Sequence, residues 1–138
     1  MGADINFYVE KLQDGQWISA SRLDLDEEGT PDLESWYTDR SLEVWAAIEP
    51  AQADLYGIDP VPPVRGVRPA SITEASDHVQ YVFDANDPGR DPVIVTLADL
   101  LAYDWDSVPD TRNLRRTLNR MEKLDLPADH VRAVIWFA

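Results

Sequence analysis

The fold is decided by the final apolar stretch of the sequence, Val131–Phe137, which reads VRAVIWF. Arg132 is its only charged residue, so the stretch is too uniformly apolar for the exposed edge of a sheet. Strands that are buried on both faces have this kind of composition. We therefore expect Val131–Phe137 to lie centrally in a β-sheet.

The opening of the sequence predicts a β-hairpin that shares this sheet. Asp4–Leu12 alternates apolar and polar residues, which is typical of a strand with one buried face. Gln13-Asp14-Gly15 has the composition of a turn, and Gln16–Leu23 follows as the return strand. We expect a single α+β domain over residues 1–138, with a mixed sheet built from this hairpin and the C-terminal strand.

Helical patterns between these strands predict three or four helices packed around the sheet. Apolar residues recur at helical spacing in Asp39–Glu49, and residues 71–83 and 96–103 each begin with a capping box. A short buried strand is expected at Val93–Val95. The clearest helix is Asp110–Leu124, whose apolar side opposes a basic stripe. The basic stripe consists of Arg112, Arg115, Arg116, Arg120 and Lys123.

Composition excludes several classes of site and partner. The 138 residues include 12 Lys plus Arg and 26 Asp plus Glu, a formal net charge of −14, with two His and no Cys. The lack of Cys excludes disulfides and Cys nucleophiles, and the negative charge opposes direct binding to nucleic acids or anionic membranes. No apolar run approaches the roughly 18 residues of a membrane helix, and the N-terminus does not resemble a signal peptide. We therefore expect a cytoplasmic protein.

An acidic segment, Leu23–Glu34, is the leading candidate for partner binding. Its charge would complement a protein partner with a basic surface, although a solvated loop has the same composition. Trp36 and Tyr37 follow this segment and are either interface anchors or core residues. The predicted partner-binding residues are Asp24, Asp26, Glu27, Glu28, Asp32, Glu34, Trp36 and Tyr37.

No residue pattern points to catalysis, and no catalytic residue is assigned. His78 and His130 are expected at surface or capping positions. The acidic segment lacks the Gly and Glu offsets of a calcium-binding loop, so neither a metal nor another cofactor is predicted. The basic stripe either binds phosphate or an acidic partner, or faces solvent and the chain's own carboxylates. Core positions are expected for Trp45, Trp105 and Trp136.

Five segments, in order along nearly the whole chain, carry motifs that occur together elsewhere: Met1–Lys11, Arg40–Ile48, Pro63–Ser71, Thr96–Trp105 and Val131–Phe137. They resemble a family of small uncharacterised proteins of bacteriophages and their hosts, which open Met-Gly-Cys-Asp-Ile-His and close Val-Arg-x-Val-Phe-Trp-Phe. The resemblance implies a phage origin, and hence the cytoplasm of a host cell, but it implies no activity.

Departures from the family pattern fall at polar positions. Ala3 stands where the family has Cys, Asn6 where it has His, and Gly89-Arg90-Asp91 where it has Gly-His-Ser. If the family has His-based chemistry, the resemblance implies that this member has lost it.

Three functional hypotheses follow. The first is a non-catalytic, phage-type accessory protein that binds and modulates or inhibits a host protein. A sharper version of it is nucleic-acid mimicry against a host defence or DNA-binding protein. The second is a small-ligand-binding or sequestering protein, or a degenerate enzyme, with its site in the Pro- and Gly-rich loops. The third is a structural virion component. The predicted ligand-binding residues of the second hypothesis are Asp4, Asn6, Arg65, Arg68 and Arg90.

Overall fold

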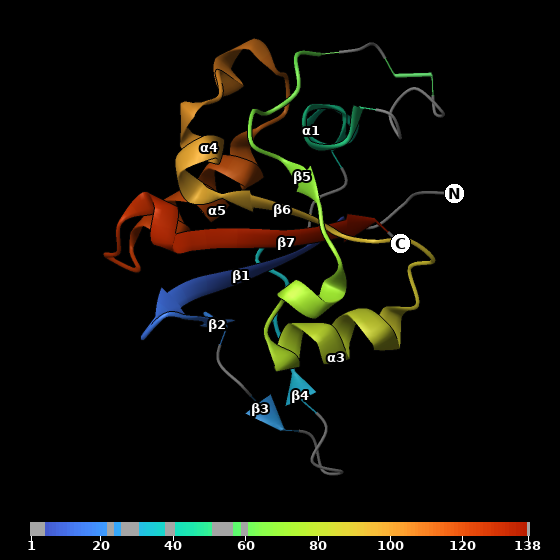
Figure 1. Cartoon of the computed structure of the whole chain (residues 1–138). Helices are drawn as coiled ribbons and strands as arrows, with labels where there is room; N and C mark the ends of the chain where they lie inside the picture. The colour runs from blue at the N-terminus through green and yellow to red at the C-terminus, as the bar shows by residue number, and fades with distance from the viewer. Residues whose placement is uncertain are drawn as a thin grey trace.

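A five-stranded antiparallel sheet forms the centre of the protein, with strand order β2-β1-β7-β6-β5 (Figure 1). It is seen in a computed structural model that describes residues 5–21, 24–25, 31–37, 41–50, 57–58 and 61–137. All four strand pairings are antiparallel, so the expectation of a mixed sheet was wrong in this detail, whereas the α+β class is confirmed. The strands are β1 (Ile5–Gln13), β2 (Gln16–Ser19), β5 (Arg68–Pro69), β6 (Val93–Thr96) and β7 (Val131–Phe137).

The C-terminal strand β7 lies in the middle of the sheet, as its composition predicted. It pairs with β1 from Lys11↔Val131 to Ile5↔Phe137, and with β6 on its other side. Every residue of β7 is buried, including Arg132. A strand covered on both faces and both edges needs the apolar sequence that it has.

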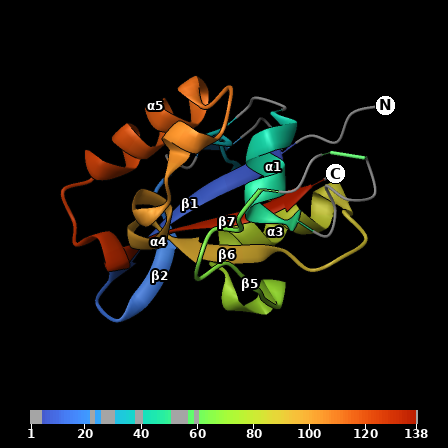
Figure 2. The same ribbon diagram turned by 90° about the horizontal axis from the view of Figure 1, so that it is seen from above.

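Helices cover both faces of the sheet (Figures 1 and 2). On one face lie α1 (Leu42–Ile48), α4 (Leu97–Ala102) and α5 (Arg112–Glu122), and on the other lies α3 (Asp77–Asn86). A two-stranded ladder, β3 (Asp24–Leu25) with β4 (Pro31–Asp32), lies on the α3 side. Three 3-10 turns complete the described elements: η1 (Ile72–Glu74), η2 (Trp105–Ser107) and η3 (Ala128–His130).

Alternation along the strands divides the core into two clusters. Phe7 and Val9 point to the face that α1, α4 and α5 cover, whereas Tyr8 points to the α3 face. Trp45 stacks on Phe137 in the first cluster, with ring centroids 4.7 Å apart. The predicted core positions of Trp45, Trp105 and Trp136 are confirmed, because each of these side chains is buried.

The predicted helix over 71–83 is wrong at its start. Ser71 caps the short turn η1, and the chain then leaves helical geometry at Ala75, where ψ is 165°. Helix α3 begins only after Ser76 and continues to Asn86, beyond the predicted end. The interruption has a tertiary cause, because the Glu74 carbonyl and the Ser76 N–H are hydrogen bonded to side chains of the sheet.

The other predicted helices are confirmed with shifted ends. Ser41 caps α1 by accepting a hydrogen bond from the Val44 N–H, and Thr96 caps α4 by accepting one from the Asp99 N–H. Helix α5 buries Leu114, Leu118 and Met121 on one side. Within the described ranges, no helix is both long and apolar enough to span a membrane.

Candidate binding site beside the edge strand

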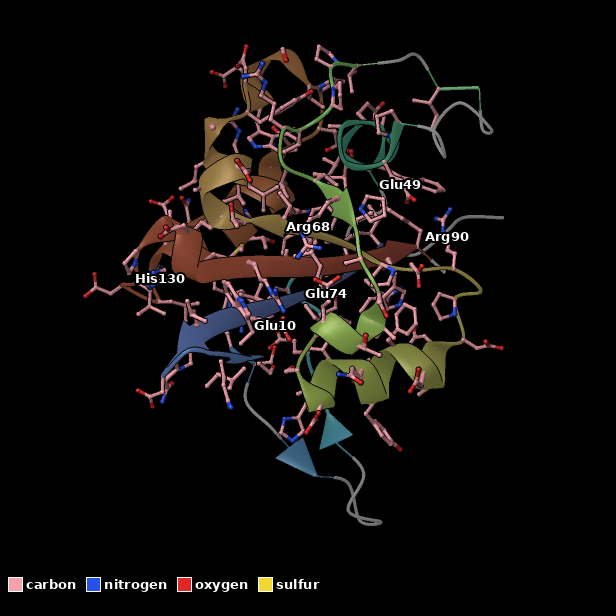
Figure 3. The ribbon with its side chains drawn as sticks, in the orientation of Figure 1. Glu10, Glu49, Arg68, Glu74, Arg90 and His130 are labelled. Carbon is pink, nitrogen blue, oxygen red and sulfur yellow. The ribbon has the colours of Figure 1, made fainter. Side chains whose placement is uncertain are left out.

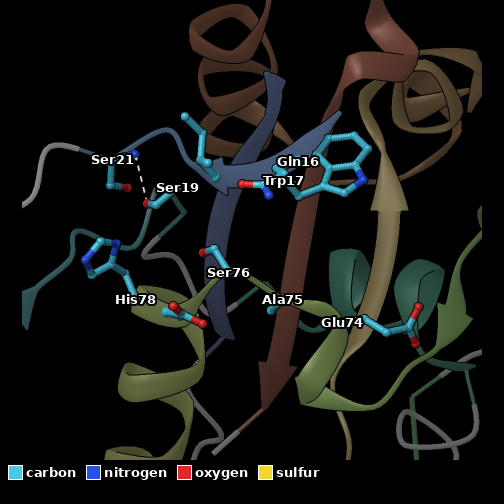
Figure 4. A pocket seen from close by; sticks show the side chains of 10 residues that line it. Gln16, Trp17, Ser19, Ser21, Glu74, Ala75, Ser76 and His78 are labelled. Atoms are coloured by element: carbon cyan, nitrogen blue, oxygen red, sulfur yellow. Dashed lines mark hydrogen bonds between the residues drawn. The ribbon is translucent and has the colours of Figure 1, made fainter. Parts of the chain in front are cut away.

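An open hollow of about 700 Å³ lies between the edge strand β2 and the start of α3 (Figure 4). Its strand side is formed by residues 16–19 with Ser21, and its helix side by residues 74–78. We call this hollow the edge pocket. Its lining residues are Gln16, Trp17, Ile18, Ser19, Ser21, Glu74, Ala75, Ser76, Asp77 and His78.

A buried ion pair lies on the sheet beside the edge pocket. Glu10 of β1 is directly opposite Arg132 of β7, and the two side chains are joined at 2.8 Å. The side chain of Glu10 is 0% exposed and that of Arg132 is 6% exposed. Two buried charges are tolerated when they are paired and their remaining polar atoms are hydrogen bonded.

The remaining bonds of this pair hold the helix side of the edge pocket. The second carboxylate oxygen of Glu10 accepts a hydrogen bond from the Ser76 N–H at 2.6 Å. Arg132 donates from Nη2 to the Glu74 carbonyl at 2.7 Å. The Trp17 ring lies 4.3 Å from the Arg132 guanidinium and partly covers it from the strand side. The ion pair therefore fixes the junction of η1 and α3 to the sheet, and with it the width of the pocket.

Among the described residues, the outer backbone edge of β2, along the edge pocket, has no pairing partner. The Ala20 N–H donates to the Val9 carbonyl at 2.8 Å, so Val9 and Ala20 form a hydrogen-bonded pair. Because hydrogen-bonded and non-bonded pairs alternate, Glu10↔Ser19 and Leu12↔Trp17 are non-bonded pairs. The backbone N–H and C=O groups of Trp17 and Ser19 therefore point away from β1, at the outer edge of the sheet.

Carboxylates dominate the charge of the edge pocket. Its described lining includes Glu74 and Asp77, but no Lys or Arg. Hydrogen bonds from the Arg68 guanidinium, at 3.1 and 3.3 Å, hold the pKa of Glu74 below its usual value of 4.5 (Figure 3). Glu74 therefore stays ionised in mildly acidic solution and keeps its negative charge at the rim.

The Ser76 hydroxyl is buried and has no hydrogen-bond partner among the described residues. As the residue before α3 it would normally cap the helix, but its side chain makes no capping bond. A serine nucleophile needs a base within hydrogen-bond reach and access to the substrate. The buried hydroxyl has neither within the part of the chain that the structure describes. The same ranges contain no group of three or more residues placed to hold a metal ion.

The acidic segment Leu23–Glu34, which we call the acidic strip, is only partly described by the structure. Asp26, Glu27 and Glu28 lie outside the described residues, and of Asp24 and Asp32 the backbone alone is described, paired in the ladder of β3 and β4. Glu34 is exposed and makes two hydrogen bonds of 3.2 Å with Arg120 of the basic stripe. Glu34 is therefore engaged within the molecule.

Of the two alternatives that the sequence left open for Trp36 and Tyr37, the structure shows core residues rather than exposed interface anchors. Trp36 is 8% exposed and Tyr37 is 1% exposed. The Trp36 N–H donates to the Phe7 carbonyl at 2.8 Å, which attaches this segment to β1 where β2 has ended. The indole N–H donates to the Ser21 hydroxyl, and the Arg120 guanidinium lies 4.0 Å from the ring. These contacts hold the Trp36 side chain inward, and the Tyr37 ring packs near Phe7, with ring centroids 6.2 Å apart.

The structure does not bring the predicted ligand-binding arginines into one site. Arg68 is paired with Glu74, whereas Arg90 is paired with Glu49 at 3.3 Å and lies over the Phe137 ring. Burial raises the pKa of Glu49 above 4.5, and Arg90 opposes that shift. Arg65 is exposed in a turn and lines a different hollow, of about 220 Å³, together with Asp99.

The other two predicted ligand-binding residues do not complete such a site. Asp4 lies outside the described residues. Asn6 is half-buried on β1, opposite Trp136. The predicted site in the Pro- and Gly-rich loops is therefore not assembled by the described residues.

The two histidines and the basic stripe are dispersed. His130 lies at the opposite end of the sheet from Arg90 (Figure 3), next to Asp129, and His78 lines the edge pocket. In the basic stripe, Arg115 is paired with Asp106, and Arg120 with Glu34. The structure therefore favours pairing with the chain's own carboxylates for these two members of the stripe.

The sequence analysis did not identify the edge pocket. One signal was present: Glu10 and Arg132 are charged residues in two strands that are otherwise strongly apolar toward the core. Opposite charges in neighbouring central strands would have suggested a buried pair, and therefore a register. Trp17, Ser19 and Ser76 carried no comparable signal.

Three comparisons with known proteins found no relative of this chain. No family model, no curated protein and no solved structure matches this chain.

Proposed function

We propose that this protein acts by binding a protein partner with a basic surface. The observation that carries the proposal is the edge pocket, which is open and is bordered by the outer edge of β2. Its described lining includes the carboxylates of Glu74 and Asp77 and no Lys or Arg. It belongs to a chain with a net charge of −14, which attracts cationic surfaces over a distance of about one Debye length.

The acidic strip supports the same proposal from the same side of the molecule. The ladder of β3 and β4, which carries Asp24 and Asp32, lies on the α3 side of the sheet (Figure 1), and the start of α3 lines the edge pocket. A partner that approaches this side would meet both features. The phage-family resemblance adds the hypothesis that the partner is a host protein, and that its modulation or inhibition is the biological effect.

The test is recovery of the tagged protein from bacterial lysate, followed by native mass spectrometry. We expect an added mass of several kilodaltons or more, identified as a basic polypeptide. Affinity of the purified pair should fall at least about tenfold between roughly 50 and 500 mM NaCl, because screening weakens attraction between surface charges. Competition by DNA would further identify nucleic-acid mimicry.

Two charge-matched variants show whether the acidic strip contributes. The first carries Asp24→Asn, Asp26→Asn, Glu27→Gln and Glu28→Gln, and the second carries Asp84→Asn, Asp91→Asn, Asp110→Asn and Asp125→Asn. Each removes four negative charges, so a larger loss of affinity in the first variant locates the effect. An added mass of only a few hundred daltons, or affinity that is insensitive to salt, would contradict the proposal.

A further inference from the structure

We propose that an extended peptide segment carrying Lys or Arg side chains adds to the outer edge of β2 as a sixth strand, with alternate side chains in the edge pocket. The inference rests on the proposed function and specifies how the basic partner is recognised. Strand addition needs a free row of backbone groups and a place for every second side chain. The structure provides both at β2.

The free backbone groups are those of Trp17 and Ser19. Both residues lie in non-bonded pairs with β1, so their N–H and C=O groups point outward. Within the part of the chain that the structure describes, no backbone or side-chain group is hydrogen bonded to these outward groups. An added strand could therefore pair with two residues of β2 without breaking any described bond.

The other boundaries of the sheet are closed to such pairing. The opposite edge, β5, is two residues long and contains Pro69, which has no N–H to donate. Beyond the end of β2, the same edge of β1 is occupied, because Phe7 bonds to the Ser35 hydroxyl and to the Trp36 N–H. Edge strand β2 contains neither Pro nor Lys, the residues that commonly block strand addition.

The pocket chemistry selects the side chains of the added strand. Trp17 and Ser19 share the α3 face with Glu10, so a strand added beside them directs every second side chain toward the edge pocket. Among the described residues, the exposed charged groups that line this pocket are two carboxylates: Glu74, which is already paired with Arg68, and Asp77. A Lys or Arg side chain there gains a favourable charge interaction, whereas an acidic one is repelled.

Charge also favours a basic partner over a second copy of this chain at the same edge. Two copies joined edge to edge would bring together two molecules that each carry a net charge of −14. A basic peptide carries positive charge and is therefore attracted to this molecule instead of being repelled by it. Self-association through β2 is therefore the competing outcome for the experiment to detect.

The experiment uses the full-length protein and two synthetic peptides, acetylated (Thr-Lys)₄ amide and its acidic counterpart (Thr-Glu)₄ amide. Binding is followed by NMR, and amide hydrogen exchange is measured residue by residue. We expect the Lys peptide to bind with a Kd on the order of 100 μM, and the Glu peptide to bind at least about tenfold more weakly. The amides of Trp17 and Ser19 should exchange fast in the free protein and become protected when the Lys peptide is bound.

Two pairs of variants test the backbone and the charge separately. Ser19→Pro removes an outward N–H, whereas Ser19→Ala keeps it, so the Pro variant should bind the Lys peptide at least about tenfold more weakly than the Ala variant. Asp77→Asn and Asp125→Asn each remove one exposed carboxylate, but only Asp77 lines the edge pocket. Asp77→Asn should therefore weaken the Lys peptide more. Circular dichroism reports whether each variant is folded. If a variant does not fold, amide protection in the unaltered protein still tests the proposal.

The outcomes distinguish this inference from the function on which it rests. Salt-sensitive binding of the Lys peptide without protection of Trp17 and Ser19 would overturn strand addition and leave a basic-partner function standing. If the Lys peptide shows no saturable binding up to about 1 mM, strand addition is overturned. If, in addition, no basic polypeptide is recovered from lysate, the proposed function is overturned too. Equal binding of both peptides, or a β2-dependent dimer of the free protein, would also overturn the inference.

Discussion

At the residue scale, the Glu10–Arg132 pair is the contact that links the sheet to the candidate site. The carboxylate is fully buried and bonds both to Arg132 and to the Ser76 N–H. Arg132 in turn bonds to the Glu74 carbonyl and lies against the Trp17 ring. One ion pair thus touches β1, β2, β7 and the start of α3.

Removing one member of this pair should be strongly destabilising. Arg132→Ala leaves the Glu10 carboxylate buried without its counter-charge, and we expect the free energy of unfolding to fall by about 3–5 kcal/mol. The double variant Glu10→Leu with Arg132→Met removes both charges and should lose less. Urea denaturation followed by circular dichroism measures both. A single variant within about 1 kcal/mol of the unaltered protein would show that the pair is not buried as described.

The Arg68–Glu74 pair predicts a pH dependence with a definite sign. Arg68 lowers the pKa of Glu74 in the folded protein, so the folded state holds this proton less tightly than the unfolded state. The stabilisation is present above the ordinary value of 4.5 and is lost as the pH falls through the folded-state pKa.

The variant Arg68→Ala tests this dependence. NMR titration of the Glu74 carboxyl carbon should show a higher pKa in the variant than in the unaltered protein. The stability difference between the two proteins should shrink as the pH is lowered from about 6 to about 3. A Glu74 pKa that does not move on substitution would contradict the assignment of Arg68 as the cause.

At the element scale, the hydroxyl residues that precede α4 and α3, Thr96 and Ser76, have different roles. The Thr96 hydroxyl accepts a hydrogen bond from the Asp99 N–H, which is the N-cap bond of a capping box, and donates one to the Asp99 carboxylate. Ser76 makes no capping bond, and its own N–H is bonded to Glu10. Helix α4 is thus started by its own sequence, whereas the start of α3 is held by the sheet.

This difference predicts unequal effects of two similar substitutions. Thr96→Ala should lower the free energy of unfolding by about 1 kcal/mol, because it removes the cap. Ser76→Ala should change it by less than about 0.5 kcal/mol, because it removes a hydroxyl that has no partner. Thermal or urea unfolding of the two variants measures the difference. Equal losses would contradict the assignment of the Thr96 side chain as the functional cap.

At the scale of the whole molecule, the net charge of −14 is the main electrostatic feature of the protein. Internal ion pairs engage Arg68, Arg90, Arg115, Arg120 and Arg132 with described carboxylates. Acidic side chains outnumber basic ones by 26 to 12, so pairing every base would still leave an excess of negative charge. Self-repulsion of that excess opposes the compact state.

Salt should therefore stabilise the protein. We expect the thermal midpoint to rise by a few degrees between about 20 and 300 mM NaCl, because screening reduces the repulsion. The variant with Asp84→Asn, Asp91→Asn, Asp110→Asn and Asp125→Asn should show a smaller rise. Differential scanning calorimetry measures the midpoint, and a midpoint that falls with salt would show that attractive ion pairs outweigh the repulsion.

Local pattern in the sequence determined the elements and the place of the central strand. Alternation in Asp4–Leu12, the apolar run Val131–Phe137 and the cap at Thr96 each depend on residues within a few positions of one another. Such patterns can be read directly, and the structure confirms the hairpin, the central β7 and the cap of α4.

Only the tertiary structure decided which residues meet. Glu10 and Arg132 are 122 positions apart, and their bonds interrupt the helical pattern between Glu74 and Ser76. The same kind of distant bond, from Trp36 to Phe7, accompanies the burial of an aromatic residue for which the sequence left core and interface positions open. The physical reason is that a single sequence specifies local periodicity, whereas a register between distant strands follows from burying the whole core at once.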